Sequence, residues 1–133
     1  MELSILVLGM GTDLIEVERV EKFIAQGDDY LAGIFTVHEI AYCRSKHFPQ
    51  QHFAARFAAK EAFMKALGCG WRDGIRFADI EVSNDELGKP HLTVSGKARE
   101  KLDNFATAPY YVHLSLAHLK SIATATVIIE TRE

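Results

Sequence analysis

The stretch that decides the fold is FAARFAAKEAFMKALG, residues 53–68. At about 100° per residue, it places four apolar side chains on one stripe of a helix, namely Phe53, Phe57, Met64 and Leu67. Pro49 suits the first turn of such a helix, and Gly68 suits its C-terminal cap. The sequence therefore predicts a helix over residues 49–67, the longest in the chain.

The same helix carries Glu61 and Lys65 one turn apart, and small residues flank them at Ala54, Ala58 and Ala62. We expect the small residues to leave room for a ligand. The charged ends of the Glu61 and Lys65 side chains should then contact the surface of that ligand. A surface Glu–Lys pair at this spacing is common and contributes only about 0.2–0.5 kcal/mol. Considered alone, the helix is therefore also compatible with an ordinary salt bridge.

Shorter elements are expected on both sides of this helix. Strands are predicted at residues 5–15, 75–83, 91–95, 110–118 and 122–131, and helices at residues 16–25, 36–46 and 96–105. Thr36 and Glu39 have the spacing of a capping box, residues 84–90 have the composition of a turn, and Ala108-Pro109 interrupts the chain. Interspersed strands and helices with hairpins predict one α+β domain over residues 1–133, an antiparallel sheet packed with helices.

The first predicted strand ends in GMGTD, residues 9–13. Strict alternation puts Ile5, Val7, Gly9, Gly11 and Asp13 on one face. A carboxylate at the end of an apolar strand is costly to bury without compensation, and the two glycines lack side chains to fill the space beside it. We therefore expect Asp13 to lie beside an open cleft, with capping of the following helix as the alternative. The third glycine of a dinucleotide-binding fingerprint is absent.

A third polar segment is HLSLAH, residues 113–118. His113 and His118 are five residues apart on a predicted strand, so they point to opposite faces and should not share one metal ion. Ser115 lies on the face of His113, and His118 lies at the end of the strand. Each of these residues is by itself also compatible with a structural role.

The composition is that of one globular domain, with 48% hydrophobic and 25% charged residues in 133. No apolar run approaches the roughly 20 residues needed to span a bilayer. Residues 4–10 are apolar but few and lack a basic flank, which argues against a signal peptide. Cys43 and Cys69 lack metal-type spacing, so we expect reduced thiols in a cytoplasmic protein.

The net charge of -3 conceals an uneven distribution. Residues 1–40 hold eight acidic and two basic side chains, whereas residues 41–76 hold seven basic and two acidic ones. A basic middle in an acidic chain fits an anionic ligand of limited size better than a long nucleic acid. A solvated helix face is the plainer interpretation of the same pattern.

Together these segments resemble the holo-acyl-carrier-protein synthases, the small bacterial phosphopantetheinyl transferases. The matching segments are GxGxDLI at 9–15, RFAAKEAFxKALG at 56–68, DIEV at 79–82, GKP at 88–90 and HLSLxH at 113–118. The resemblance covers nearly the whole chain, and the long helical segment is its most specific part.

The resemblance implies a magnesium-dependent enzyme that moves the 4′-phosphopantetheine arm of coenzyme A onto a serine of an apo acyl carrier protein and releases 3′,5′-ADP. Asp13 and Glu61 would hold Mg²⁺ together with the pyrophosphate of coenzyme A. Glu61, directly or through a metal-bound water, is the expected base for the serine. Lys65 is expected to stabilise or protonate the leaving 3′,5′-ADP.

Contacts to coenzyme A are expected by resemblance at Arg56, Lys65, Gly68 and His118. His118 also counts among the expected catalytic groups. Lys46 lies in the basic stretch and is expected to meet a further phosphate.

The resemblance also implies a homotrimer with active sites between neighbouring subunits, and a carrier protein that docks on basic residues of the first helix. Here Arg19 and Lys22 alternate with three glutamates, so we expect a narrow basic strip with Arg19 as its main anchor and Arg44 as a further contact. Two other functions stay open. One is a coenzyme A-binding module without turnover, and the other is a trimeric scaffold whose charges form only surface pairs.

Overall fold

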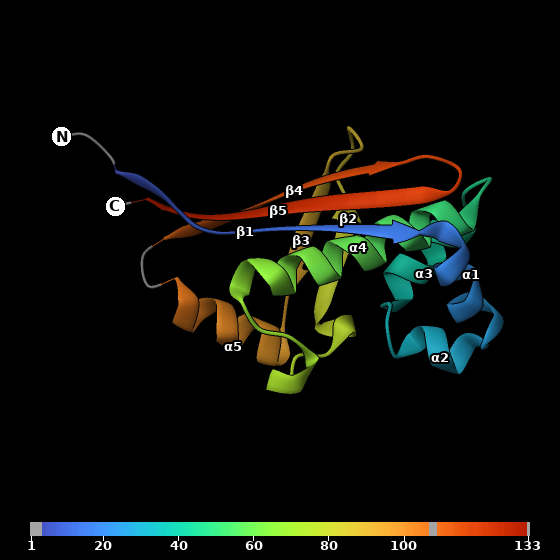
Figure 1. Ribbon diagram of the computed structural model, residues 1–133, viewed down its shortest axis with the longest axis horizontal. Coiled ribbons are helices and arrows are strands. Elements are labelled where there is room, and N and C mark those ends of the chain that lie inside the picture. The colour runs from blue at the N-terminus through green and yellow to red at the C-terminus, as the bar shows by residue number, and fades with distance from the viewer. Residues whose placement is uncertain (1–3, 107–108, 133) are drawn as a thin grey trace.

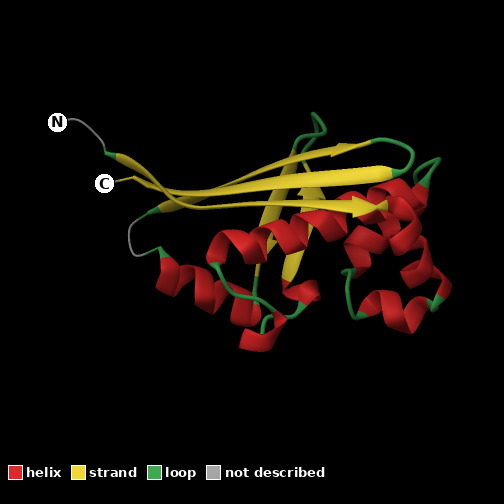
Figure 2. Ribbon diagram, in the orientation of Figure 1, coloured by secondary structure: helices red, strands yellow, loops and turns green. Residues whose placement is uncertain are grey.

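The computed structural model describes residues 4–106 and 109–132, which form strands and helices of one domain (Figures 1 and 2). The strands are β1 (Ile5–Glu16), β2 (Ile80–Asn84), β3 (Pro90–Val94), β4 (Tyr110–His118) and β5 (Ile122–Arg132). The helices are α1 (Val17–Ala25), α2 (Asp28–Ala32), α3 (Val37–Arg44), α4 (Pro49–Leu67) and α5 (Gly96–Phe105), with short 3-10 turns η1 (Trp71–Asp73) and η2 (Phe77–Asp79). The expected α+β class is confirmed. Among the helices of these described ranges, none is long and apolar enough to cross a membrane.

The larger sheet is antiparallel, with the strand order β1-β5-β4, and β2 pairs with β3 in a separate hairpin. Helix α4 runs along one face of the larger sheet, and the other helices lie on that same side (Figure 1). The buried side chains of β5 alternate from Ala123 to Ile129 and pack toward α4. Strands β1 and β4 form the two edges of the larger sheet, so they are separated by β5.

Helix α4 begins and ends as its sequence predicts. Pro49 occupies the first turn, and Gly68 follows Leu67 in the left-handed conformation at φ 74°. The backbone N–H of Cys69 donates to the carbonyl oxygen of Met64 at 3.2 Å, the long hydrogen bond of a Schellman motif. The expected capping box of Thr36 and Glu39 is likewise present at the start of α3.

The glycines of β1 serve close packing rather than an open cleft. A Cβ atom at Gly11 would lie 2.0 Å from the carbonyl oxygen of Ala62, and one at Gly9 would lie 2.1 Å from that of Ala66. The space beside Asp13 is therefore filled by the backbone of α4, and the small residues of α4 likewise pack against the sheet. The expectation that these small residues leave room for a ligand was wrong.

Two other expectations need correction, and one helix was not predicted. A bulge between Val7 and Gly9 breaks the alternation of β1, so Ile5 and Val7 face away from α4 while Gly9, Gly11 and Asp13 face it. Residues 75–79 form a bend with the turn η2 rather than a strand, and β2 begins at Ile80. Helix α2 was not predicted, because five residues are too short for a periodic pattern. The break expected at Ala108 falls outside the described residues.

Candidate active site

Asp13 and Lys65 meet on the flank of α4 that lies next to β1. Lys65 Nζ donates to Asp13 Oδ1 at 2.9 Å and to the carbonyl oxygen of Thr12 at 3.1 Å. Glu61 lies one turn before Lys65, on the same flank. Gly68 ends the helix just beyond Lys65, and a Cβ atom there would meet nothing within 4 Å, so the space beside its backbone is open. The structure thus brings together the residues expected to hold the metal and the leaving group.

The half-buried carboxyl of Glu61 titrates differently from an exposed glutamate. Burial raises the pKa of Glu61, and the nearby negative charge of Asp13 raises it further, while the positive charges of Lys65 and Arg19 act in the opposite direction. Burial and the Asp13 charge therefore make this carboxylate a stronger base than that of an exposed glutamate.

The donor set also fits a magnesium ion. Mg²⁺ is commonly held by one or two carboxylates, with waters and substrate phosphates completing its coordination. Asp13 and Glu61 supply two carboxylates at one place. Within residues 4–106 and 109–132 there is no cluster of three or more His, Cys, Asp or Glu side chains of the kind that encloses a metal with protein ligands alone.

A second group of expected site residues surrounds a pocket of about 420 Å³ between α4, β4 and the β2–β3 hairpin. The side chain of Arg56 is buried there, and its Nη2 donates to Asn84 Oδ1 at 2.5 Å. Its guanidinium carbon lies 4.0 Å from the ring centroid of Tyr42. Arg56 Nε is buried and has no hydrogen-bond partner among the described residues. A buried guanidinium that borders a pocket and has an N–H without an acceptor is suited to bind an anion.

His118 and Lys46 lie near Arg56. His118 Nδ1 is 3.0 Å from Gln51 Oε1, and its ring packs edge-on against His52 with centroids 5.1 Å apart. Lys46 Nζ lies 4.7 Å from the ring centroid of Tyr42. Burial lowers the pKa of His52, and the charges of His118, Arg56 and Lys46 lower it further. The region is therefore electropositive, as expected for contacts to phosphates. His113 points to the opposite face, as expected, and lies 2.7 Å from Glu130.

The two groups of residues lie on opposite flanks of α4. Arg56 and Glu61 are five residues apart, which corresponds to about 140° around a helix. Asp13 is on β1 and His118 is on β4, the two edge strands of a sheet with β5 between them. Within one chain, His118 is therefore not placed beside Glu61 and Lys65, although all three were expected to act in catalysis.

The residues expected to dock a carrier protein fall into two places. Arg19 and Lys22 line a pocket of about 580 Å³ together with Leu14 and Ile122, next to the Glu61 flank. Arg19 lies 6.0 Å from the ring centroid of Phe23. Arg44 lines a different pocket, which it shares with Glu21 and Ile24 of α1, and it forms a salt bridge of 2.6 Å with Asp28.

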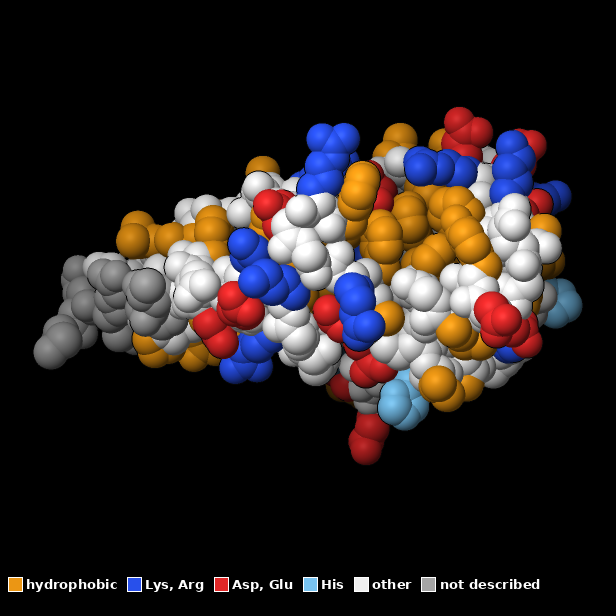
Figure 3. All heavy atoms as spheres, turned by 90° about the horizontal axis from the view of Figure 1, so that it is seen from below, with side chains coloured by type: hydrophobic (Ala, Val, Ile, Leu, Met, Phe, Trp, Pro, Cys, Tyr) orange, Lys and Arg blue, Asp and Glu red, His pale blue; other side chains and the backbone are white. Residues whose placement is uncertain are grey.

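An aromatic cluster near Arg19 was missed by the sequence analysis. The rings of Phe23 and Phe57 have centroids 5.2 Å apart, and Tyr30 and Phe77 extend the cluster at 5.9 and 5.5 Å. The cluster belongs to the helical side of the molecule, where Figure 3 shows hydrophobic side chains gathered in a hollow with basic side chains nearby. These four residues come from four separate elements, so no local sequence pattern links them.

An α+β domain with paired carboxylates, a lysine beside them and a cation-lined pocket has the groups that a metal-dependent transferase of phosphate-containing substrates uses. The family model of the 4′-phosphopantetheinyl transferase superfamily matches residues 9–126. The chain belongs to this superfamily.

Individual relatives confirm the resemblance seen in the sequence. A holo-[acyl-carrier-protein] synthase of Geobacter sp. (strain M21) is 48% identical over 126 residues, which cover 94% of this chain and 99% of the relative. The crystal structure of a Bacillus anthracis holo-(acyl-carrier-protein) synthase in complex with CoA (3′,5′-ADP) has a TM-score of 0.76 and 35% identity, with 94% and 97% of the two chains covered. The Helicobacter pylori holo-[acyl-carrier-protein] synthase in complex with coenzyme A has a TM-score of 0.76 and 30% identity, with 90% and 98% covered.

Proposed function

We propose that this chain transfers the 4′-phosphopantetheine group of coenzyme A to a serine of apo acyl carrier protein and releases 3′,5′-ADP. The observation that carries the proposal is the group formed by Asp13, Glu61 and Lys65 on one flank of α4, in a chain that is 48% identical to a holo-[acyl-carrier-protein] synthase. The group provides a metal-binding pair of carboxylates, a base and a cation for a leaving phosphate.

Each residue has a role in the transfer. Asp13 and Glu61 would hold Mg²⁺, which when bound neutralises negative charge on the pyrophosphate of coenzyme A. Glu61 takes the proton of the carrier serine as the serine oxygen bonds to the β-phosphorus. The bond from that phosphorus to the oxygen of 3′,5′-ADP breaks, and Lys65 stabilises or protonates the departing phosphate.

The pocket around Arg56 is the proposed site for the remaining phosphate of coenzyme A, the 3′-phosphate. The buried Arg56 guanidinium, with its unused Nε–H, supports this role, as does the positive surrounding provided by His118 and Lys46. Gly68 would let the ligand approach the backbone at the end of α4, because no side chain fills the space there.

The separation of the two residue groups supports a homotrimer with active sites between neighbouring subunits. The face of the larger sheet that points away from α4 exposes large apolar side chains, including Met10 and Leu14 of β1 and Ile122 of β5. A second copy that covered this face could bring its Arg56 flank toward the Glu61 flank of the first. Light scattering should then give a mass near three times 14.9 kDa.

Docking of the carrier protein is proposed on α1, with Arg19 and Lys22 facing the acidic carrier and Arg44 at the edge of the surface. The nearness of Arg19 to Glu61 supports this position, because a docked carrier must deliver its serine to that carboxylate. Cys43 and Cys69 are both free thiols, which suits the proposed location in the cytoplasm.

Magnesium dependence tests the proposal directly. Release of 3′,5′-ADP from coenzyme A should require both the apo carrier protein and Mg²⁺, and it should stop when EDTA removes the metal. Binding of coenzyme A without release of 3′,5′-ADP under complete conditions would instead indicate a non-catalytic binding module.

A further inference from the structure

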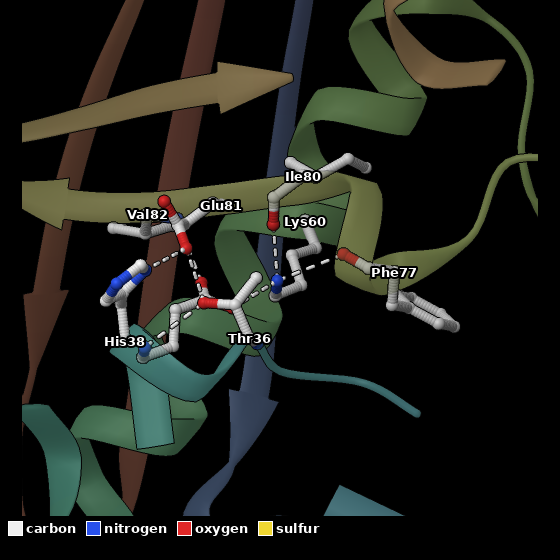
Figure 4. Close-up of polar contacts among 8 residues, drawn as sticks. Thr36, His38, Lys60, Phe77, Ile80, Glu81 and Val82 are labelled. Carbon is white, nitrogen blue, oxygen red and sulfur yellow. Dashed lines mark hydrogen bonds and ion pairs between the residues drawn. The ribbon is translucent and has the colours of Figure 1, made fainter. Parts of the chain in front are cut away.

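A buried ion pair holds α4 at the residue immediately before Glu61. Lys60 Nζ lies 2.7 Å from Glu39 Oε1, and 0% of either side chain is exposed. The same ammonium donates to the carbonyl oxygen of Phe77 at 3.0 Å and to that of Ile80 (Figure 4). The three N–H donors of Lys60 therefore all have acceptors, which a buried charge requires.

Both carboxylate oxygens of Glu39 are also used. Oε1 accepts from the backbone N–H of Thr36 at 2.9 Å, and Oε2 accepts from that of Val82 at 2.8 Å. The backbone N–H of Glu39 in turn donates to Thr36 Oγ1 at 3.2 Å. One ion pair thus joins the start of α3, the middle of α4 and the beginning of β2.

A second contact ties the same flank of α4 to the other end of β2. Arg56 lies one turn before Lys60 and bonds to Asn84, the last residue of β2. On its sheet side, α4 is in close contact with Gly9 and Gly11. The helix is therefore fixed on two sides, and its rotation about its own axis is set by the β1 glycines and by the polar contacts to β2.

This rotation determines where Glu61 points. Glu61 projects about 100° away from Lys60, with its carboxylate roughly 6 Å from the helix axis, so a rotation of about 10° would move that carboxylate by about 1 Å. A displacement of about 1 Å in a reacting group can lower a rate about 100-fold.

We propose that Glu39 and Lys60 are positioning residues for the transfer reaction, which act by setting the rotation of α4 and hence the distance between Glu61 and Asp13. This inference rests on the proposed function. Neither residue can touch the substrate, because both side chains are fully enclosed. Their effect must pass through the helix that carries Glu61.

A purely stabilising role makes a different prediction. Replacing a buried ion pair by apolar residues of similar volume often leaves stability unchanged, whereas removing one partner leaves an unpaired buried charge. Burial lowers the pKa of Lys60, and the charge and hydrogen bond of Glu39 counteract that effect. An effect on stability can therefore be distinguished from an effect on positioning by comparing two variants. One variant changes only Glu39 and leaves Lys60 without its ion-pair partner, and the other replaces both residues by apolar ones.

The experiment uses Glu39→Gln and the double variant Glu39→Leu/Lys60→Met. Glu39→Gln keeps the shape of the side chain but removes the negative charge that pairs with Lys60, and its new amide NH2 must face either the donors of Lys60 and Thr36 or the N–H of Val82. The control is Leu102→Ala, which removes buried side-chain atoms from α5 and takes no hydrogen bond or ion pair from Glu39 or Lys60. All chains are assayed well below their melting temperatures, and rates are expressed per folded molecule.

We expect kcat to fall at least about 10-fold in both variants and the half-saturating Mg²⁺ concentration to rise, while KM for coenzyme A stays within about threefold. The Leu102→Ala control should lose stability and keep its kcat. The positioning role is wrong if a folded variant keeps both kcat and its magnesium requirement, or if the control loses kcat to the same extent. If the double variant does not fold, the kcat and the magnesium requirement of Glu39→Gln alone decide the test. A wild-type chain without transfer would refute the proposed function itself.

Discussion

At the scale of single residues, the proposed chemistry depends on which charged side chains share a flank of α4. Asp13 and Glu61 are the proposed metal-binding carboxylates, and Lys65 bonds to Asp13 at 2.9 Å. Lys60 is adjacent to Glu61 in the sequence but lies about 100° away around the helix, where it is completely buried. Neighbouring residues of one motif therefore have different surroundings.

We predict that Asp13→Ala and Glu61→Gln each lower kcat at least about 100-fold while the fold stays intact, because a site with two carboxylates has no spare ligand or base. Turnover is measured at millimolar Mg²⁺, and circular dichroism reports the fold. Glu100→Gln on the exposed surface of α5 is the matched control. Near-normal turnover of either variant would rule out the metal assignment.

Lys65→Ala should lower kcat at least about 10-fold more than it weakens binding of coenzyme A, because a cation matched to a leaving group acts mainly in the transition state. Calorimetry gives the dissociation constant, and steady-state kinetics gives kcat. Lys97→Ala removes an equivalent charge from α5 as the control. An equal loss of affinity and of overall efficiency would make Lys65 only a binding residue.

At the scale of elements, the packing of β1 against α4 places Asp13 beside Lys65. The glycines of β1 were expected to border a cleft, because the sequence shows only that side chains are missing. It does not show that the helix backbone fills the space, since this contact joins residues more than fifty positions apart. The apolar stripe of α4, its start at Pro49 and its end at Gly68 could be predicted, because their patterns are local.

Gly11→Ala should destabilise the fold by about 1–3 kcal/mol or more, because the added methyl group would overlap the carbonyl oxygen of Ala62 and force β1 and α4 apart. Urea unfolding measures the loss. Gly70→Ala is the control, since its added Cβ would meet only Met64 Sδ at an ordinary 3.8 Å. Equal stability of the Gly11 variant and the wild type would contradict the close packing described here.

At the scale of the whole molecule, the sequence predicts the class of fold and the family, whereas the placement of the site residues needed the structure. The roles of Asp13, Glu61 and Lys65 came from family resemblance, and the structure brings the three together. The separation of Arg56 from Glu61 follows from the helical period, whereas that of His118 from the three residues depends on strand order, which no local pattern reveals. The aromatic cluster around Phe23 was missed for the same reason.

The narrow basic strip on α1 leads to a prediction about carrier docking. Arg19→Glu should raise KM for the carrier at least about fivefold at low salt and leave KM for coenzyme A nearly unchanged, because complementary charge speeds encounter and is screened by salt. Lys97→Glu makes the same charge change on α5 as the control. If both Michaelis constants stay unchanged for Arg19→Glu, docking occurs elsewhere, and Arg44 with Lys46 becomes the next surface to test.

The most direct test of the proposed function is the intact mass of an apo acyl carrier protein after incubation with this chain, coenzyme A and Mg²⁺. Transfer of phosphopantetheine predicts a gain of about 340 Da, a test of the site's chemistry that fold similarity cannot replace. A carrier variant with its acceptor serine changed to alanine should gain nothing. As a positive control, a transferase of known activity should modify the same apo carrier, which shows that this carrier can accept phosphopantetheine. An unchanged mass with a competent carrier and a folded chain would contradict the account.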